Sequence, residues 1–278
     1  MRRAHLRYLL GGAFQTLSWM EAGPADGAPV VCVHGLTRNA RDFDVLAAAL
    51  AGQGRRVLSV DLPGRGESGW LADPALYVPP SYAVALGHLF ARLDGPIDYV
   101  GTSLGGIVGM LLAAGAHTPI RRLVLNDMGA RVPAEAVRRI ADYVSAPKSF
   151  PNLTAFEAHL REVHAPFGIA TDAGWRHMAE TSHRMAPDGS VVPHYDPAIA
   201  VPFSAAADQP INLEFVWRLV GVPTLILRGA TSDVLEADVA AAMAARPGVE
   251  LVTLPGIGHA PALDTPAQTD LIARFLSA

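Results

Sequence analysis

The sequence predicts an α/β fold with a mostly parallel central sheet and flanking helices, and two observations support this. In the first half of the chain, short β-branched runs alternate with longer runs rich in Ala and Leu, which is typical of parallel strands covered by helices. The alternation stops near residue 129 and resumes after residue 212. Since half of the 278 residues are hydrophobic and 17% are charged, the chain can bury a core of domain size.

The elements follow from local composition and apolar spacing. An early strand is expected at 14–21, before a Gly-Pro-Ala-Asp-Gly turn. Further strands are expected at 30–33, 57–61, 97–101, 123–126, 224–227 and 250–254. Helices are expected at 43–51, 81–93, 104–114, 236–245 and 268–276.

The stretch 129–212 differs in composition from the rest of the chain, because prolines recur in it and runs typical of strands are absent. Nine of the 19 aromatic residues fall within 143–217. We therefore expect a core of residues 1–128 and 213–278, interrupted by a mainly helical cap, or lid, over residues 129–212. Such a cap would cover the strand ends where α/β sheets bind ligands. Trp70, Trp175 and Tyr195 are the aromatic residues predicted to line the pocket.

Composition excludes several function classes. The net charge of −4 disfavours nucleic acid as a partner, because phosphate binding needs clustered Lys and Arg. Cys32 is the only cysteine, so no intramolecular disulfide forms, and a cytoplasmic location with a buried, inert thiol is expected. The uncharged stretch 101–116 is too short and too rich in glycine to span a membrane. No pattern indicates a metal, a cofactor or an oligomeric state.

The strongest motif is Gly101-Thr102-Ser103-Leu104-Gly105, a G-x-S-x-G sequence between a predicted strand and a predicted helix. In that position the glycines allow a sharp turn that projects the serine hydroxyl at the end of the sheet. Ser103 is therefore the candidate nucleophile. The alternative is a glycine-rich turn with a helix-capping serine.

A serine hydroxyl is a weak nucleophile near pH 7, so it needs a base, and the base needs a group that orients it. His259 lies in a loop after the last predicted strand and is the candidate base. For the acid we prefer Asp233, in the loop after the strand 224–227, and Asp127 is the rival because it also follows a strand. Other histidines are interpreted as surface, core or pocket residues: His5, His88, His117, His159, His164, His177, His183 and His194.

The order Ser103, Asp233, His259 resembles that of the α/β-hydrolase superfamily, specifically its capped, serine-dependent members. His34-Gly35 and the stretch 61–68 (Asp-Leu-Pro-Gly-Arg-Gly-Glu-Ser) strengthen the resemblance. It implies that the backbone N–H groups of Leu36 and Leu104 form an oxyanion hole. His34 is expected to brace its loop. The serine argues against the dehalogenases and epoxide hydrolases of the superfamily, which carry aspartate at this position.

We expect a serine esterase that cleaves small carboxylic esters by acyl transfer, without cofactor or metal. Two alternatives stay open: a C–C bond hydrolase of ring-cleavage products, and a ligand receptor of slow turnover on the same fold. Basic residues of the cap could hold a substrate carboxylate or could lie on solvated faces. They are Arg138, Arg161, Arg176 and Arg184.

Overall fold

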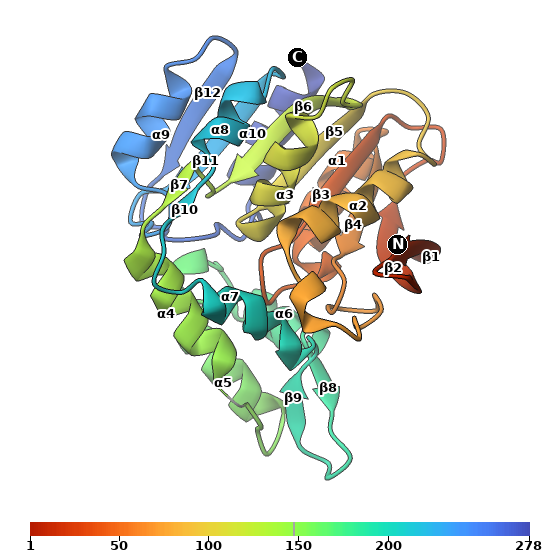
Figure 1. The fold of residues 1–278 in the computed structure, drawn as a ribbon, viewed down its shortest axis with the longest axis vertical. Coiled ribbons are helices and arrows are strands. Elements are labelled where there is room, and N and C mark those ends of the chain that lie inside the picture. The colour runs from red at the N-terminus through yellow and green to blue at the C-terminus, as the bar shows by residue number, and fades with distance from the viewer. Residues whose placement is uncertain (147) are drawn as a thin grey trace.

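An eight-stranded sheet forms the centre of the molecule in the computed structural model, which describes residues 1–146 and 148–278 (Figure 1). The strand order is β1-β2-β4-β3-β5-β6-β11-β12. β2 pairs antiparallel with both β1 and β4, and all the other pairings in the sheet are parallel. The bounds are β1 (Arg2–Leu10), β2 (Ala13–Ala22), β3 (Pro29–Val33), β4 (Arg56–Asp61), β5 (Ile97–Thr102), β6 (Ile120–Asn126), β11 (Thr224–Gly229) and β12 (Val249–Leu254). The predicted α/β class with a mostly parallel sheet is confirmed.

Side chains of each strand alternate between two helical layers, because successive residues of a strand point to opposite faces. On β3, Val31 and Val33 belong to the apolar cluster that includes α2 (Pro79–Phe90) and α3 (Leu104–Ala113). Val30 and Cys32 belong to the opposite cluster, with α1 (Asp44–Gly52) and α10 (Pro266–Ser277). The remaining core helices are α8 (Glu214–Leu219) and α9 (Ala237–Ala244). The sheet is therefore covered on both faces.

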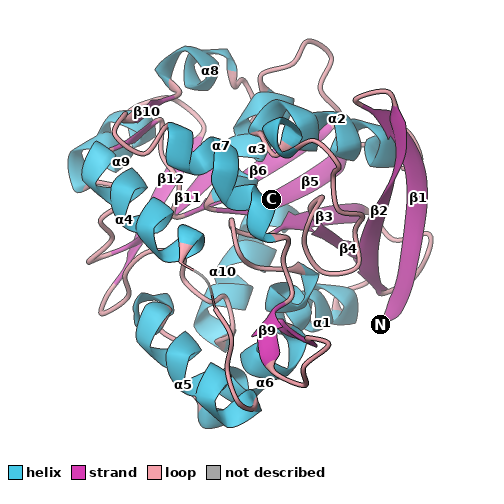
Figure 2. Ribbon diagram, turned by 60° about the horizontal axis from the view of Figure 1, so that its bottom comes forward, coloured by secondary structure: helices cyan, strands magenta, loops and turns pink. Residues whose placement is uncertain are grey.

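Between β6 and β11 the chain leaves the sheet and forms a mostly helical segment at the end of the molecule drawn lowest in Figure 1. Its elements are β7 (Arg131–Val132), α4 (Ala134–Ser145), α5 (Leu153–Val163), α6 (Asp172–Thr181), β8 (His183–Met185), β9 (Val191–Pro193), α7 (Ala200–Ala205) and β10 (Ile211–Asn212). Figure 2 brings this end forward and shows α4, α5, α6 and α7 in front of the sheet. Short 3₁₀ helices complete the chain at η1 (Ala40–Phe43), η2 (Pro74–Leu76), η3 (Ala165–Phe167) and η4 (Pro197–Ile199).

The chain enters and leaves the inserted segment at the same place. β7 and β10 pair with each other, Val132 opposite Ile211, so the chain departs and returns side by side. The segment also has a small apolar cluster of its own, which includes Phe156, Trp175 and Met178. It therefore packs both internally and against the sheet's helices, since the main cluster also contains Val137 of α4.

Candidate active site

Ser103 lies on a sharp turn between β5 and α3. Its backbone has φ 52° and ψ −113°, a conformation that costs a non-glycine residue about 1–3 kcal/mol. Strand and helix approach so closely that a Cβ on Gly101 would lie 2.4 Å from the carbonyl oxygen of Gly105. The Ser103 side chain makes no capping hydrogen bond to α3, so the helix-cap alternative is wrong.

His259 connects this hydroxyl to a buried carboxylate. Its Nε2 lies 2.8 Å from Ser103 Oγ, and its Nδ1 lies 2.7 Å from Asp127 Oδ2. A carboxylate only accepts, so Nδ1–H donates to Asp127 and Nε2 is left to accept from the serine hydroxyl. The three side chains form one continuous hydrogen-bonded chain from the serine to the acid.

Asp127 is held rigidly at the end of β6. The side chain is fully buried, and it also accepts from the Gly229 backbone N–H at 2.8 Å and from Ser232 Oγ at 2.5 Å. Its positive φ of 54° is a conformation that Asp adopts more readily than most residues. Each carboxylate oxygen of Asp127 therefore accepts a hydrogen bond from a group other than His259.

The prediction that Asp233 orients His259 is wrong. The Asp233 side chain is 50% exposed and pairs instead with Arg139, at 2.7 and 3.0 Å. The loop after β11 does reach the site, but it contributes Ser232 rather than its neighbour. β6 and β11 are adjacent parallel strands, so both loops end at the same edge of the sheet. A signal favouring Asp127 is that β6 also lies directly beside β5, which carries Ser103.

Two backbone N–H groups flank Ser103. Leu104 is the first residue of α3, where a helix leaves its N–H groups without intrahelical partners. Leu36 follows Gly35, and a Cβ on Gly35 would lie 3.6 Å from Ser103 Cβ. Within residues 1–146 and 148–278, neither N–H donates a hydrogen bond. Both groups are therefore free to bond a substrate oxygen.

The loop that carries Leu36 is braced from behind. His34 Nδ1 lies 2.7 Å from the Gly35 carbonyl oxygen, and the Leu62 N–H donates to His34 Nε2 at 3.0 Å. Burial lowers the pKa of His34 well below its usual range, which keeps the ring neutral. Arg65, also buried, donates from Nε to the Leu36 carbonyl at 2.8 Å. These bonds hold Leu36 in its position beside Ser103.

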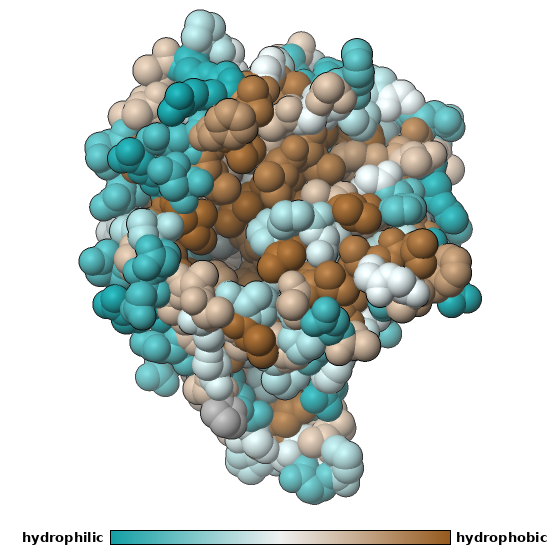
Figure 3. Space-filling view, viewed as in Figure 1, coloured by the Kyte–Doolittle hydropathy of each residue, from teal (hydrophilic) through white to brown (hydrophobic). Residues whose placement is uncertain are grey.

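A cavity of about 160 Å³ opens onto Ser103 and His259. Most of its wall area is apolar, and Ile107 of α3 and Phe203 of α7 contribute to it. On the face shown in Figure 3, apolar residues gather around a hollow over α3, α7 and α8. Two of these helices, α3 and α7, also form part of the cavity wall.

The three predicted pocket aromatics do not line this cavity. Trp70 is 46% exposed and lies under the Arg184 guanidinium. Trp175 packs in the inserted segment's own core, and Tyr195 lines a smaller neighbouring cavity. Trp175 and Tyr195 are buried, but in other parts of the molecule, and Trp70 is exposed.

The basic residues proposed to hold a carboxylate are likewise absent from the cavity wall. Arg138 pairs with Asp208, while Arg161 and Arg176 both pair with Glu157. Other basic residues line the cavity, among them Arg38. Arg38 makes a bidentate ion pair with Asp42, from Nε to Oδ2 at 3.0 Å and from Nη2 to Oδ1 at 2.6 Å. These charges neutralise each other in place.

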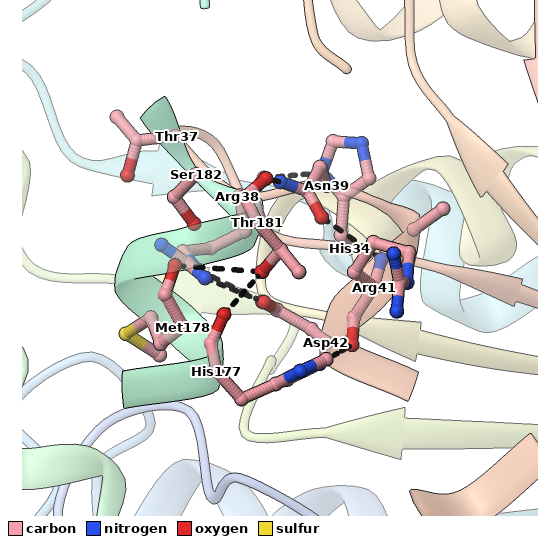
Figure 4. A network of polar contacts seen from close by, with 12 residues as sticks. His34, Thr37, Arg38, Asn39, Arg41, Asp42, His177, Met178, Thr181 and Ser182 are labelled. Atoms are coloured by element: carbon pink, nitrogen blue, oxygen red, sulfur yellow. Dashed lines mark hydrogen bonds and ion pairs between the residues drawn. The ribbon is translucent and has the colours of Figure 1, made fainter. Parts of the chain in front are cut away.

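A polar network joins the loop after β3 to α6 of the inserted segment (Figure 4). Asn39 Nδ2 donates to the Thr181 carbonyl at 2.7 Å. Asp44 accepts from Arg41 Nε at 2.7 Å and lies 3.1 Å from His177 Nε2. The hydrogen bond to Asp44 raises the pKa of His177. Core and insert are therefore linked beside the cavity by charged groups.

Within residues 1–146 and 148–278, no three or more His, Cys, Asp or Glu side chains are grouped as metal ligands. Over the same residues, no helix is long and apolar enough to cross a membrane.

Comparisons with known proteins identify the family. The family model described as the alpha/beta hydrolase family matches residues 30–269. A 3-hydroxybutyrate-oligomer hydrolase of Cupriavidus necator is 40% identical over 264 residues, which cover 91% of this chain and 90% of that protein.

Solved structures show the same relationship. An alpha/beta hydrolase from Novosphingobium aromaticivorans matches 99% of this chain and 98% of its own, with a TM-score of 0.87 and 38% identity. A Rickettsia typhi protein matches 100% of this chain and 99% of its own, with a TM-score of 0.93 and 28% identity. With its fold, its serine turn and these relatives, the chain belongs to the alpha/beta hydrolase family.

Proposed function

We propose that this protein is a serine esterase that cleaves short esters of hydroxy acids, such as oligomers of 3-hydroxybutyrate, through an acyl-enzyme. The observation that carries the proposal is the hydrogen-bonded chain Ser103–His259–Asp127 at the wall of an apolar cavity. The substrate class comes from the Cupriavidus necator relative, which matches nearly the whole chain.

In the acylation step, Ser103 Oγ attacks the ester carbonyl while its proton passes to His259 Nε2. Asp127 keeps the imidazole in the required tautomer and stabilises the imidazolium that forms. The carbonyl oxygen becomes negative and accepts hydrogen bonds from the Leu36 and Leu104 N–H groups. One such donor is worth about 2.7–4 kcal/mol in a serine protease. These two groups constitute the proposed oxyanion hole.

Collapse of the tetrahedral intermediate breaks the bond to the alcohol oxygen, and His259 returns its proton to that oxygen. Water then attacks the acyl-enzyme, with His259 again taking a proton, and the free acid leaves with Ser103 restored. Every proton is returned within the two half-reactions. The scheme therefore needs no cofactor or metal.

The segment 129–212 is proposed as the cap, over a core of residues 1–128 and 213–278. The cavity is close to the ~150 Å³ of an engineered cavity that binds benzene. A 3-hydroxybutyryl group has about as many non-hydrogen atoms as benzene, so the cavity suits one monomer unit of such an oligomer. The rest of an oligomer would extend toward the open end.

The test is acid release from the linear dimer of 3-hydroxybutyrate and from methyl butyrate, followed in a pH-stat. Wild-type protein is expected to release acid over many turnovers, and Ser103→Ala to release none. One equivalent of acylation followed by no turnover would identify a receptor instead. No release and no acylation would overturn the proposal. For the C–C hydrolase alternative, no residue contact in the cavity offers specific support.

A further inference from the structure

His164 occupies a special place in the cavity. It ends α5, is only 5% exposed, and lines the same cavity as Ser103 and His259. Its ring packs on Phe167, with centroids 4.5 Å apart and planes at 30°, and lies edge-on to Tyr143 at 6.3 Å. Two aromatic neighbours therefore fix the orientation of the imidazole.

Neither ring nitrogen of His164 has a partner in the chain as far as the structure describes it. No side-chain or backbone group of residues 1–146 and 148–278 bonds either nitrogen, and neither nitrogen is among the fully buried atoms without a partner, so both are accessible in the cavity wall. His164 as a whole is only 5% exposed, yet both of its nitrogens are unbonded and accessible, so they can bond a group that enters the cavity. A ligand group in the cavity would supply the missing partner.

The ring is neutral near pH 7. Burial is the main cause of a pKa well below the usual range for His164, and the permanent positive charges of Arg38 and Lys148 lower the pKa further. A neutral imidazole has one N–H donor and one acceptor nitrogen. It therefore suits a group that both donates and accepts, and it offers no charge to attract a carboxylate.

A second polar pair lies beside it. Thr37 Oγ1 and Tyr143 OH are 2.9 Å apart, and both residues line the cavity with His164. One hydroxyl of the pair donates to the other, which leaves a single proton free for a further bond. The polar corner, defined as Thr37, Tyr143 and His164, thus contrasts with the apolar walls around it.

We propose that His164, supported by the polar corner, binds the free hydroxyl of a 3-hydroxyacyl substrate and makes the enzyme selective for hydroxylated acyl groups. This inference rests on the proposed esterase function. A hydroxyl donates to the acceptor nitrogen or accepts from the N–H, whereas a plain alkyl chain leaves both nitrogens unpaired. Sites built to bond a substrate hydroxyl reject analogues that lack it far more strongly than apolar pockets discriminate by size.

The test compares two esters of nearly the same shape, methyl 3-hydroxybutyrate and methyl 3-methylbutanoate, in which a methyl group replaces the hydroxyl. The measured quantity is the ratio of their kcat/KM values. Wild-type protein is expected to favour the hydroxy ester by roughly 10- to 100-fold. His164→Leu is expected to bring the ratio close to one, and His164→Gln, which keeps a donor and an acceptor, to retain part of the preference.

His159→Leu is the matched control, because His159 lies within α5, the helix that His164 caps, but lines only the smaller neighbouring cavity. In His159→Leu the ratio of the two kcat/KM values is expected to equal that of the wild type. A wild-type ratio near one, or an unchanged ratio in His164→Leu, would overturn the inference alone. Failure of the wild type to hydrolyse either ester would overturn the proposed function as well.

A second measurement does not depend on a His164 variant. In Ser103→Ala, which cannot turn over, methyl 3-hydroxybutyrate is expected to shift the ¹⁵N imidazole resonances of His164, while methyl 3-methylbutanoate leaves them in place. Equal shifts with both esters would contradict hydroxyl recognition.

Discussion

Asp127, whose carboxylate orients His259, is expected to contribute strongly to kcat. Asp127→Asn keeps the shape of the side chain but favours the wrong imidazole tautomer, and the corresponding change in a serine protease lowers kcat about 10⁴-fold. Asp233→Asn removes only an exposed ion pair with Arg139 and should stay close to wild type. Steady-state kcat on methyl butyrate checks both variants. A larger loss in Asp233→Asn would mean that His259 is oriented by the loop after β11.

Backbone strain at Ser103 gives a prediction about stability. Glycine adopts positive φ without steric cost, whereas alanine keeps the strain that serine has at φ 52°. Ser103→Gly should therefore be more stable than Ser103→Ala by about 1 kcal/mol, and both should be inactive. Urea denaturation of the two variants measures the difference. Equal midpoints would show that the turn stores no strain.

The local motifs predicted part of the site, and the sheet order determined the rest. Gly101 and Gly105 indicate the turn at Ser103 because strand and helix nearly touch there. Asp127 and Asp233 could not be separated from sequence, since both follow strands and the choice depends on which side chain turns toward His259. The polar corner was also missed, because a lone His164 at a helix end carries no recognisable pattern.

The contact between α6 and α1 should respond to pH. Asp44 raises the pKa of His177, so the stabilising interaction is fully present below the ordinary histidine pKa of ~6.5 and is lost as pH rises through the higher folded-state value. His177→Gln is therefore expected to lower Tm more at pH 6 than at pH 9, as measured by thermal unfolding. His88→Gln is the control, because its ring bonds the Val84 carbonyl of its own helix. A Tm loss independent of pH would contradict the ion pair.

Elements with a strong periodic pattern were predicted well, whereas the edge strand β1 and the shortest strands were not. The helix expected at 43–51 is α1, and the strand expected at 14–21 is β2. The edge strand β1 was missed because only Leu6 and Tyr8 of its nine residues are buried hydrophobics. The two-residue strands β7 and β10 are too short to show any period.

Cys32 offers a probe of the whole molecule. It lies on β3 at the centre of the sheet, is fully buried, and its pKa is raised by burial. A thiol reagent such as DTNB is therefore expected to leave the native protein unlabelled and to label one thiol per chain in denaturant. The labelling rate at low denaturant then reports opening of the sheet. Fast labelling of the native protein would contradict this placement.

The paired strands β7 and β10 have a consequence for how such an enzyme diversifies. The chain between Val132 and Ile211 is joined to the core through the strand pair β7–β10, here called the neck. Ser103, Asp127 and His259 all lie outside this segment. The entropic cost of closing a loop rises by only about 0.6 kcal/mol each time the loop length doubles. We therefore expect the core to tolerate inserted segments of very different length at this point. Recombination at the neck would thus exchange one wall of the binding site as a module, and a new specificity could be grafted onto unchanged chemistry.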